Sequence, residues 1–143
     1  MILYLDTSSL LKLYVDEQHS PAVRDWAVAA QMLTTSRVTY PEAVAALARR
    51  HRLGDLSDAS LRRASSALER QWPPVVAVEL HEGLAAELAL RPALRGLDAI
   101  QLAAALTVAE AAGVGLVAFS TFDRQLSQAA QAEGLRVLGT ADP

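Results

Sequence analysis

The chain has 143 residues, 52% of them hydrophobic and 20% charged, and its formal net charge is −3. This length suits a single domain over residues 1–143, and the composition indicates a globular chain rather than a disordered one. Cysteine is absent, which excludes disulfides, thiol catalysis and thiolate metal sites, so any metal ion needs oxygen or imidazole ligands.

Apolar strand patterns alternate with helical patterns along the chain. In chain order, the sequence predicts a strand at 2–5, helices at 8–15 and 20–30, a strand at 32–35, helices at 39–53 and 57–72, a strand at 75–78, helices at 81–91 and 97–112, a strand at 115–119, a helix at 123–133 and a strand at 136–138. Ser20-Pro21 and Ser57 suit helix starts, because serine caps and proline fits the first helical position. The alternation predicts an α/β class: an α/β/α sandwich around a mainly parallel sheet of about four to five short strands.

Membrane segments are not expected. No apolar run approaches the roughly 20 residues that span a bilayer, and no basic segment precedes the apolar N-terminus as it would in a signal peptide. We therefore expect a cytoplasmic protein with no membrane partner. The charge is uneven, because residues 45–72 hold six arginines against three acids within an otherwise acidic chain.

Four acids fall where the expected strands and helices meet. Asp6 follows the first strand, Glu42 and Asp98 lie in the first turns of their helices, and Asp123 lies between a strand and a helix. Each has a local explanation, because carboxylates cap or stabilise helix N-termini. Thr39 and Glu42, for example, have the spacing of a capping box.

Convergence of these acids in space would support a metal site instead. Two ionised carboxylates about 4 Å apart repel by roughly 4 kcal/mol at an effective dielectric near 20, whereas a helix cap contributes about 1 kcal/mol. A shared pocket is therefore unfavourable unless a cation such as Mg²⁺ or Mn²⁺, which prefer oxygen ligands, lies between the carboxylates. The sequence alone leaves both explanations open.

Four segments carry a resemblance to a known family: YLDTSSLLKLYVDE, TYPEAVAALARR, LRGLDAIQLAAAL and FSTFDRQLSQAAQAEGLRVLG. Together they resemble the PIN-domain family, and in particular the VapC-type toxins of bacterial type II toxin–antitoxin systems. The resemblance runs from Ile2 to about Gly139. It implies a PIN-like fold and a metal-dependent endoribonuclease.

The resemblance also assigns roles to residues of this chain. It implies a catalytic cluster made of Asp6, Glu42, Asp98 and Asp123, which binds Mg²⁺ or Mn²⁺ and hydrolyses RNA phosphodiesters. Asp6 and Asp98 would be the main metal ligands, Asp123 would complete the site, and Glu42 would bind a second ion or orient water. Accessory hydroxyls are implied at Ser8, which would bond Asp6, and at Thr121.

Two features near the acids concern substrate binding. Gln101 departs from the family pattern, where histidine is frequent, and we expect this change to alter substrate contacts rather than metal binding. Arg49, Arg50 and Arg52 follow Glu42 on one helix and are candidate contacts to the RNA backbone. A solvated surface cluster is the alternative.

The resemblance further implies partners: an RNA substrate, a small cognate antitoxin that blocks the acidic pocket, and a second copy of the chain in a homodimer. Apolar residues of the first two helices are candidates for the antitoxin groove, with core packing as the alternative: Leu10, Leu11, Tyr14 and Trp26. His19, His51 and His81 lack metal-ligand spacing, so we expect them at the surface.

Rival functions are weaker. A phospho-acceptor switch domain needs a late lysine beside its acids, but Lys12 is the only lysine of the chain. Phosphatases that form an aspartyl-phosphate want a second aspartate two residues after the first, where this chain has Ser8. The remaining alternative is a PIN-like RNA-binding or interaction domain with weak or no catalysis, because ligands alone do not establish activity.

Overall fold

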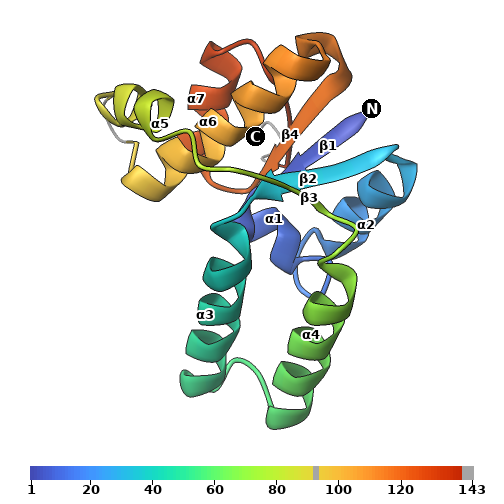
Figure 1. Cartoon of the computed structure of the whole chain (residues 1–143). Coiled ribbons are helices and arrows are strands. Elements are labelled where there is room, and N and C mark those ends of the chain that lie inside the picture. Colours follow the sequence, from blue (N-terminus) through green and yellow to red (C-terminus); the bar gives the residue numbers. More distant parts are fainter. Residues whose placement is uncertain (92–93, 140–143) are drawn as a thin grey trace.

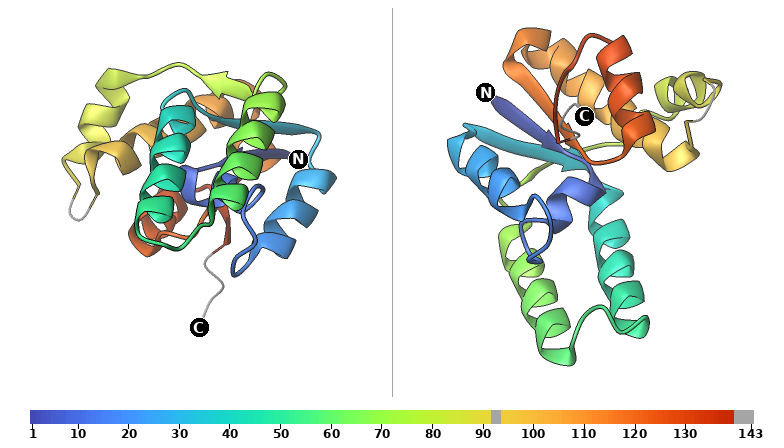
Figure 2. Two further views of the ribbon diagram at one scale, coloured as in Figure 1. Left: turned by 90° about the horizontal axis from the view of Figure 1, so that it is seen from below. Right: turned by 180° about the vertical axis from the view of Figure 1, so that it is seen from behind.

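A five-stranded parallel sheet runs through the centre of the molecule, with helices on both of its faces (Figures 1 and 2). The computed structural model describes residues 1–91 and 94–139 of the chain. Its strands are β1 (Ile2–Leu5), β2 (Met32–Ser36), β3 (Val76–Val78), β4 (Val117–Thr121) and β5 (Arg136–Gly139). Its helices are α1 (Thr7–Leu11), α2 (Ser20–Ala29), α3 (Thr39–Arg52), α4 (Asp58–Gln71), α5 (Glu82–Ala89), α6 (Gly96–Ala112) and α7 (Arg124–Ala132), and a 3-10 turn, η1 (Val114–Leu116), precedes β4. The predicted α/β sandwich with a mainly parallel sheet is confirmed.

The strand order β3-β2-β1-β4-β5 places β1 in the middle of the sheet. Every pairing is parallel, and Tyr4 of β1 lies between Thr34 of β2 and Phe119 of β4. The chain builds the sheet outward from β1 in one direction and then in the other, so the order reverses between β1 and β4. In open α/β sheets, ligands bind beyond the carboxyl ends of the strands at such a reversal. Asp6 directly follows β1, and Asp123 lies two residues beyond β4.

Alternation along β1 separates two hydrophobic cores, one on each face of the sheet. Tyr4 belongs to the core that α5, α6 and α7 cover, and its ring stacks on Phe119 with centroids 5.3 Å apart. Leu3 and Leu5 belong to the opposite core, under α1 to α4. Because β1 is buried on both faces, it reads as an uninterrupted apolar run rather than an alternating one.

Helices α3 and α4 form a hairpin that projects from the sheet (Figure 1). Leu47 and Leu68 are fully buried, so the hairpin extends the second core. Tyr40 packs against Trp72, with ring centroids 5.0 Å apart. Near the turn between the two helices, His51 Nε2 lies 2.5 Å from Asp58 Oδ1. His51 is half-buried, whereas the other two histidines are exposed as predicted.

Two stretches differ locally from the prediction. Ser20 does not cap α2: its hydroxyl donates to the Val15 carbonyl at 2.8 Å and accepts from the Glu17 N–H at 3.1 Å, which closes the loop before the helix. Helix α1 ends at residue 11 rather than 15. Residues 114–116 form the 3-10 turn, so β4 begins at Val117 instead of residue 115.

The helices also bear on the membrane prediction. Within residues 1–91 and 94–139, none of them has both the length and the apolar character needed to span a bilayer.

Candidate active site

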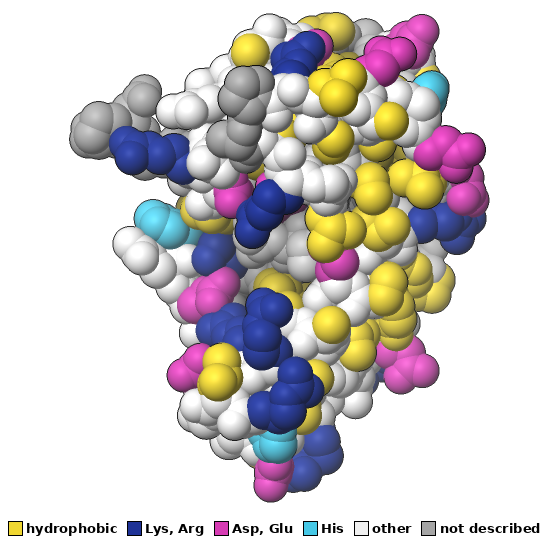
Figure 3. Space-filling view, turned by 90° about the vertical axis from the view of Figure 1, so that its left-hand side faces the viewer, with side chains coloured by type: hydrophobic (Ala, Val, Ile, Leu, Met, Phe, Trp, Pro, Cys, Tyr) yellow, Lys and Arg dark blue, Asp and Glu magenta, His cyan; other side chains and the backbone are white. Residues whose placement is uncertain are grey.

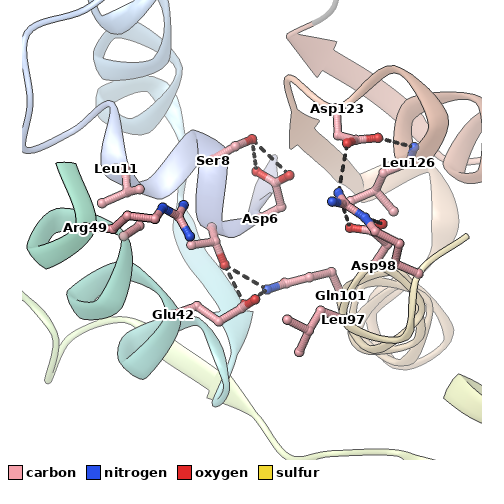
Figure 4. Close-up of a pocket in the computed structure, with 13 residues that line it drawn as sticks. Asp6, Ser8, Leu11, Glu42, Arg49, Leu97, Asp98, Gln101, Asp123 and Leu126 are labelled. Atoms are coloured by element: carbon pink, nitrogen blue, oxygen red, sulfur yellow. Dashed lines mark hydrogen bonds and ion pairs between the residues drawn. The ribbon is translucent and has the colours of Figure 1, made fainter. Parts of the chain in front are cut away.

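A pocket of about 280 Å³ opens beyond the carboxyl ends of β1 and β4 (Figure 4). All four acids that stand out in the sequence line it: Asp6, Glu42, Asp98 and Asp123. They come from four parts of the chain, namely the residue after β1, the first turns of α3 and α6, and the residue before α7. The structure therefore brings the four carboxylates together, while their catalytic roles stay predictions.

Asp6 both caps a helix and faces the pocket. Its Oδ1 accepts the N–H of Ser9 at 2.8 Å, which caps α1. The Ser8 hydroxyl lies 2.8 and 3.0 Å from the two carboxylate oxygens, as the sequence predicted, and the Thr121 hydroxyl donates to Oδ2 at 2.5 Å. Asp6 is only 4% exposed. Burial raises the pKa of its carboxyl, although the hydrogen bonds act in the opposite direction.

Glu42 points into the pocket rather than back to its own helix. The N-cap of α3 is Val38, with no side-chain cap, so the capping-box interpretation is wrong. Instead, the Thr7 hydroxyl donates to Glu42 Oε2 at 2.7 Å, and the Gln101 amide donates to the same oxygen at 3.1 Å. Both partners are distant in sequence, so the carboxylate is held by the tertiary fold.

Asp98 and Asp123 share one positively charged partner, Arg95. Arg95 Nε donates to Asp98 Oδ2 at 2.8 Å, and its Nη2 donates to Asp123 Oδ2 at 3.2 Å. The hydrogen bond to Asp98, followed by the charges of both acids, raises the pKa of the guanidinium. Asp123 is also the predicted N-cap, because its Oδ1 accepts the N–H of Leu126 at 2.9 Å.

Comparison with known proteins places this architecture in a family. Residues 3–132 match the family model of the PIN domain. The chain belongs to the PIN-domain family. This PIN domain is 37% identical over 139 residues to ribonuclease VapC49 of Mycobacterium tuberculosis, an alignment that covers 95% of this chain and 94% of VapC49. The predicted relationship to VapC-type ribonucleases is confirmed.

Solved structures share the fold. PAE2754 of Pyrobaculum aerophilum superposes with a TM-score of 0.67 at 22% identity, over 96% of this PIN domain and 89% of PAE2754. Mycobacterium tuberculosis VapC20, a toxin that cleaves the sarcin–ricin loop, superposes with a TM-score of 0.60 at 21% identity, over 89% of this chain and 94% of VapC20. At these identities the superpositions establish a common fold.

The pocket of this PIN domain fits a divalent ion in its chemistry. Its donors are carboxylate and hydroxyl oxygens, which suit Mg²⁺ or Mn²⁺. No three acidic or histidine side chains within residues 1–91 and 94–139 already surround a common point where an ion would bind. On the α6 side the reason is Arg95, whose guanidinium lies between Asp98 and Asp123. A protein cation thus balances charge that a metal ion would otherwise balance.

The arginines of α3 differ in their availability to a substrate. Figure 3 shows basic side chains gathered over the lower part of the molecule, where α3 and α4 project. Arg49 is exposed and lines the pocket. Arg50 is held by Glu17, with Nη1 2.9 Å from Oε2, and Arg52 lies at the end of α3. Of the three, Arg49 is the one that lines the pocket, and RNA contact by any of them stays a prediction.

The apolar candidates for an antitoxin groove fall into two groups. Leu10 and Leu11 are buried under α1 to α4, so core packing is the correct alternative for both, although Leu11 also lines the acidic pocket. Tyr14 and Trp26 are half-buried at the edge of the same core. Tyr14 also lines a separate, mainly apolar groove beside β2 and β3.

Two residues of the site escaped the sequence-based prediction. Arg95 left a usable signal, because an arginine three residues before Asp98 at a helix start forms an i, i+3 pair. Thr7 left none, since its partner Glu42 lies 35 residues away and only the folded chain brings them together.

Proposed function

We propose that this PIN domain is a metal-dependent endoribonuclease and the toxin of a VapBC-type toxin–antitoxin pair. The observation that carries the proposal is the meeting of four carboxylates from four elements in one pocket. Arg95 pairs with only two of the four acids, so the pocket keeps an excess of negative charge that favours cation binding. The relationship to VapC49, a ribonuclease, supports RNA as the substrate class.

Each residue of the pocket has its own role in the proposed reaction. Asp6, Asp98 and Asp123 would hold Mg²⁺ or Mn²⁺, and Glu42 would hold a second ion or accept a proton from the attacking water. The bound ion would supply Lewis-acid stabilisation to the phosphoryl group. Ser8 and Thr121 keep Asp6 oriented toward the pocket. Arg49 on the rim would bind a backbone phosphate. Water would attack the phosphorus in line with the P–O3′ bond, and the 3′-oxygen would leave and take up a proton, which gives 5′-phosphate and 3′-hydroxyl ends.

Partner proteins form the second part of the proposal. A small antitoxin would block the acidic pocket, and the chain would form a homodimer. Arg95 shows that a guanidinium can satisfy Asp98 and Asp123 together. A basic side chain from an antitoxin would therefore find matching acceptors in this pocket.

The test uses EDTA-treated protein free of antitoxin and labelled RNA substrates, including pooled tRNA and a sarcin–ricin stem-loop. We expect cleavage that needs Mg²⁺ or Mn²⁺, stops in EDTA and is lost in Asp98→Asn. The matched control is Asp16→Asn, because Asp16 is an exposed acid that pairs with Arg24 outside the pocket. Cleavage that persists in EDTA, or in Asp98→Asn, would contradict the proposal.

A further inference from the structure

Gln101 connects the interior of the sheet to the acidic pocket. It lies on α6 one turn after Asp98 and is only 3% exposed. Its Oε1 accepts the Tyr4 hydroxyl at 2.8 Å, and its Nε2 donates to Thr39 Oγ1 at 2.9 Å and to Glu42 Oε2 at 3.1 Å. One amide group thus links Tyr4 of β1 to the carboxylate of Glu42 on α3. Figure 4 shows the contact between Gln101 and Glu42.

The direction of this amide matters, because its two ends have nearly the same shape but opposite hydrogen-bonding roles. With the observed orientation, the NH₂ group faces Glu42 Oε2. A reversed amide would place its carbonyl oxygen against the carboxylate, two acceptors in contact. The amide oxygen of Gln101, which faces away from the pocket, therefore needs a hydrogen-bond donor.

Tyr4 supplies that donor. Its ring is fully buried between β1 and α6, and it does not line the pocket. With no solvent available, this hydroxyl donates to Gln101 Oε1 and fixes the amide.

The consequence falls on Glu42. Thr7 and Gln101 both donate to Oε2, whereas no hydrogen bond to Oε1 occurs among the residues that the structure describes. The carboxylate is thus anchored through one oxygen, and the other remains available to a ligand in the pocket. A rigid carboxylate loses less conformational entropy when it binds an ion than a mobile one.

We propose that Gln101, oriented by Tyr4, is a positioning residue that holds Glu42 for divalent-ion binding. The inference rests on the proposed function, since it assumes that the pocket binds such an ion. The Tyr4 hydroxyl is buried outside the pocket, yet on this inference it influences how tightly the pocket binds a metal ion.

The test measures Mn²⁺ affinity by calorimetry on the EDTA-treated full chain, without RNA. Outer partners of metal ligands typically change metal affinity by about 10- to 100-fold. We expect Gln101→Met, which keeps the shape and loses the amide, to raise the Kd about tenfold. Tyr4→Phe and Thr7→Val should raise it by roughly threefold or more each, and they keep the inference testable if Gln101→Met fails to fold. Tyr14→Phe, a hydroxyl deletion outside the site, should leave the Kd unchanged.

Two double variants show whether the effect passes through the proposed residues. Adding Tyr4→Phe to Gln101→Met should cause no further loss, because the hydroxyl acts only through the amide. In a Glu42→Gln background, Gln101→Met should change the Kd less than about twofold. A full tenfold loss in that background would overturn the inference, since the amide would then act elsewhere.

The outcomes also separate this inference from the proposed function. A wild-type chain that binds no Mn²⁺ and cuts no RNA would refute both. Wild-type binding and cleavage, together with unchanged Kd values in folded Gln101→Met and Tyr4→Phe, would refute the positioning role alone.

Discussion

The two sides of the pocket hold their carboxylates by different means. On the side of α1 and α3, Asp6 and Glu42 receive hydrogen bonds from neutral hydroxyl and amide groups. On the side of α6 and α7, Asp98 and Asp123 share the guanidinium of Arg95. The neutral donors are buried or half-buried, whereas the Arg95 side chain is 73% exposed.

The two kinds of donor have different effects on a carboxylate, because a neutral donor fixes its orientation whereas a guanidinium also neutralises its charge. Neutral donors fix the direction of a carboxylate without cancelling its charge, so Asp6 and Glu42 keep the negative charge that the proposed metal binding requires. Arg95 cancels charge, and because it is exposed, its displacement by a metal ion would cost little free energy. We infer that the first side sets where an ion binds and that the second side sets how tightly it binds.

The largest effect is expected from removing a charge on the side of α1 and α3, which we call the neutral-donor side. Asp6→Asn should lower kcat/KM for RNA by roughly 10²–10³-fold, because under the proposed function Asp6 holds the ion that stabilises charge in the transition state. The measurement is initial-rate cleavage at saturating Mn²⁺. If the arginine side alone governed catalysis, Asp6→Asn would retain most of its activity while Asp98→Asn lost it.

Arg95→Gln tests the side of α6 and α7, where a guanidinium pairs with two of the acids. Removing the competing cation should tighten Mn²⁺ binding by about threefold, a modest effect because exposed ion pairs contribute only about 0.2–1 kcal/mol each. Calorimetry at low salt measures the change, which should shrink as salt is added. Arg124→Gln is the matched control, since it removes one exposed positive charge beside Asp123 that makes no ion pair in residues 1–91 and 94–139. Weaker Mn²⁺ binding in Arg95→Gln would show that the arginine supports the site instead of competing for it.

Sequence patterns predicted the scaffold well because they reflect local physics. The apolar run of residues 2–5 and the alternation of strands with helices follow from burial and periodicity, and both determined the parallel sheet correctly. The errors came where a distant or loop contact overrode the local signal. Ser20 looks like a helix cap, yet the folded loop gives its hydroxyl a better partner in Val15.

The acids of the site could be predicted from the sequence, but the residues that form hydrogen bonds or ion pairs with them could not. Asp6 and Asp123 carry local capping patterns, and both do cap helices, so the pattern that identified them did not reveal the pocket. The Tyr4–Gln101 bond spans 97 residues, and the Arg95–Asp123 bond spans 28. Such pairings depend on sheet register and helix placement, which a single sequence does not specify at side-chain resolution.

Arg49, on the rim of the pocket, is expected to affect the binding of RNA but not the binding of the ion. Arg49→Gln should raise the KM for RNA about threefold and reduce the slope of log affinity against log salt by about 1, as expected for one lost phosphate contact. Its Mn²⁺ affinity should stay unchanged, because Arg49 bonds none of the four acids within the part of the chain that the structure describes. The control is Arg62→Gln on α4, which lies outside the pocket. An equal salt-slope change in both variants would indicate diffuse attraction by the hairpin instead of a contact at Arg49.

The smallest expected effect concerns the stability of the metal-free protein. Burial raises the pKa of Asp6, so the folded chain holds this proton more tightly than the unfolded chain does. The contribution of this group to the free energy of unfolding is therefore present at low pH and is lost as pH rises above about 4, the ordinary carboxyl range. In EDTA, Asp6→Asn should melt about 2–4 °C above the wild type at pH 7 and show a smaller advantage at pH 4. Asp16→Asn, which alters an exposed acid, should match the wild type at both pH values. If Asp6→Asn melted lower than the wild type at pH 7, the hydrogen bonds from Ser8 and Thr121 would outweigh burial, and the neutral-donor side would be stable without any ion.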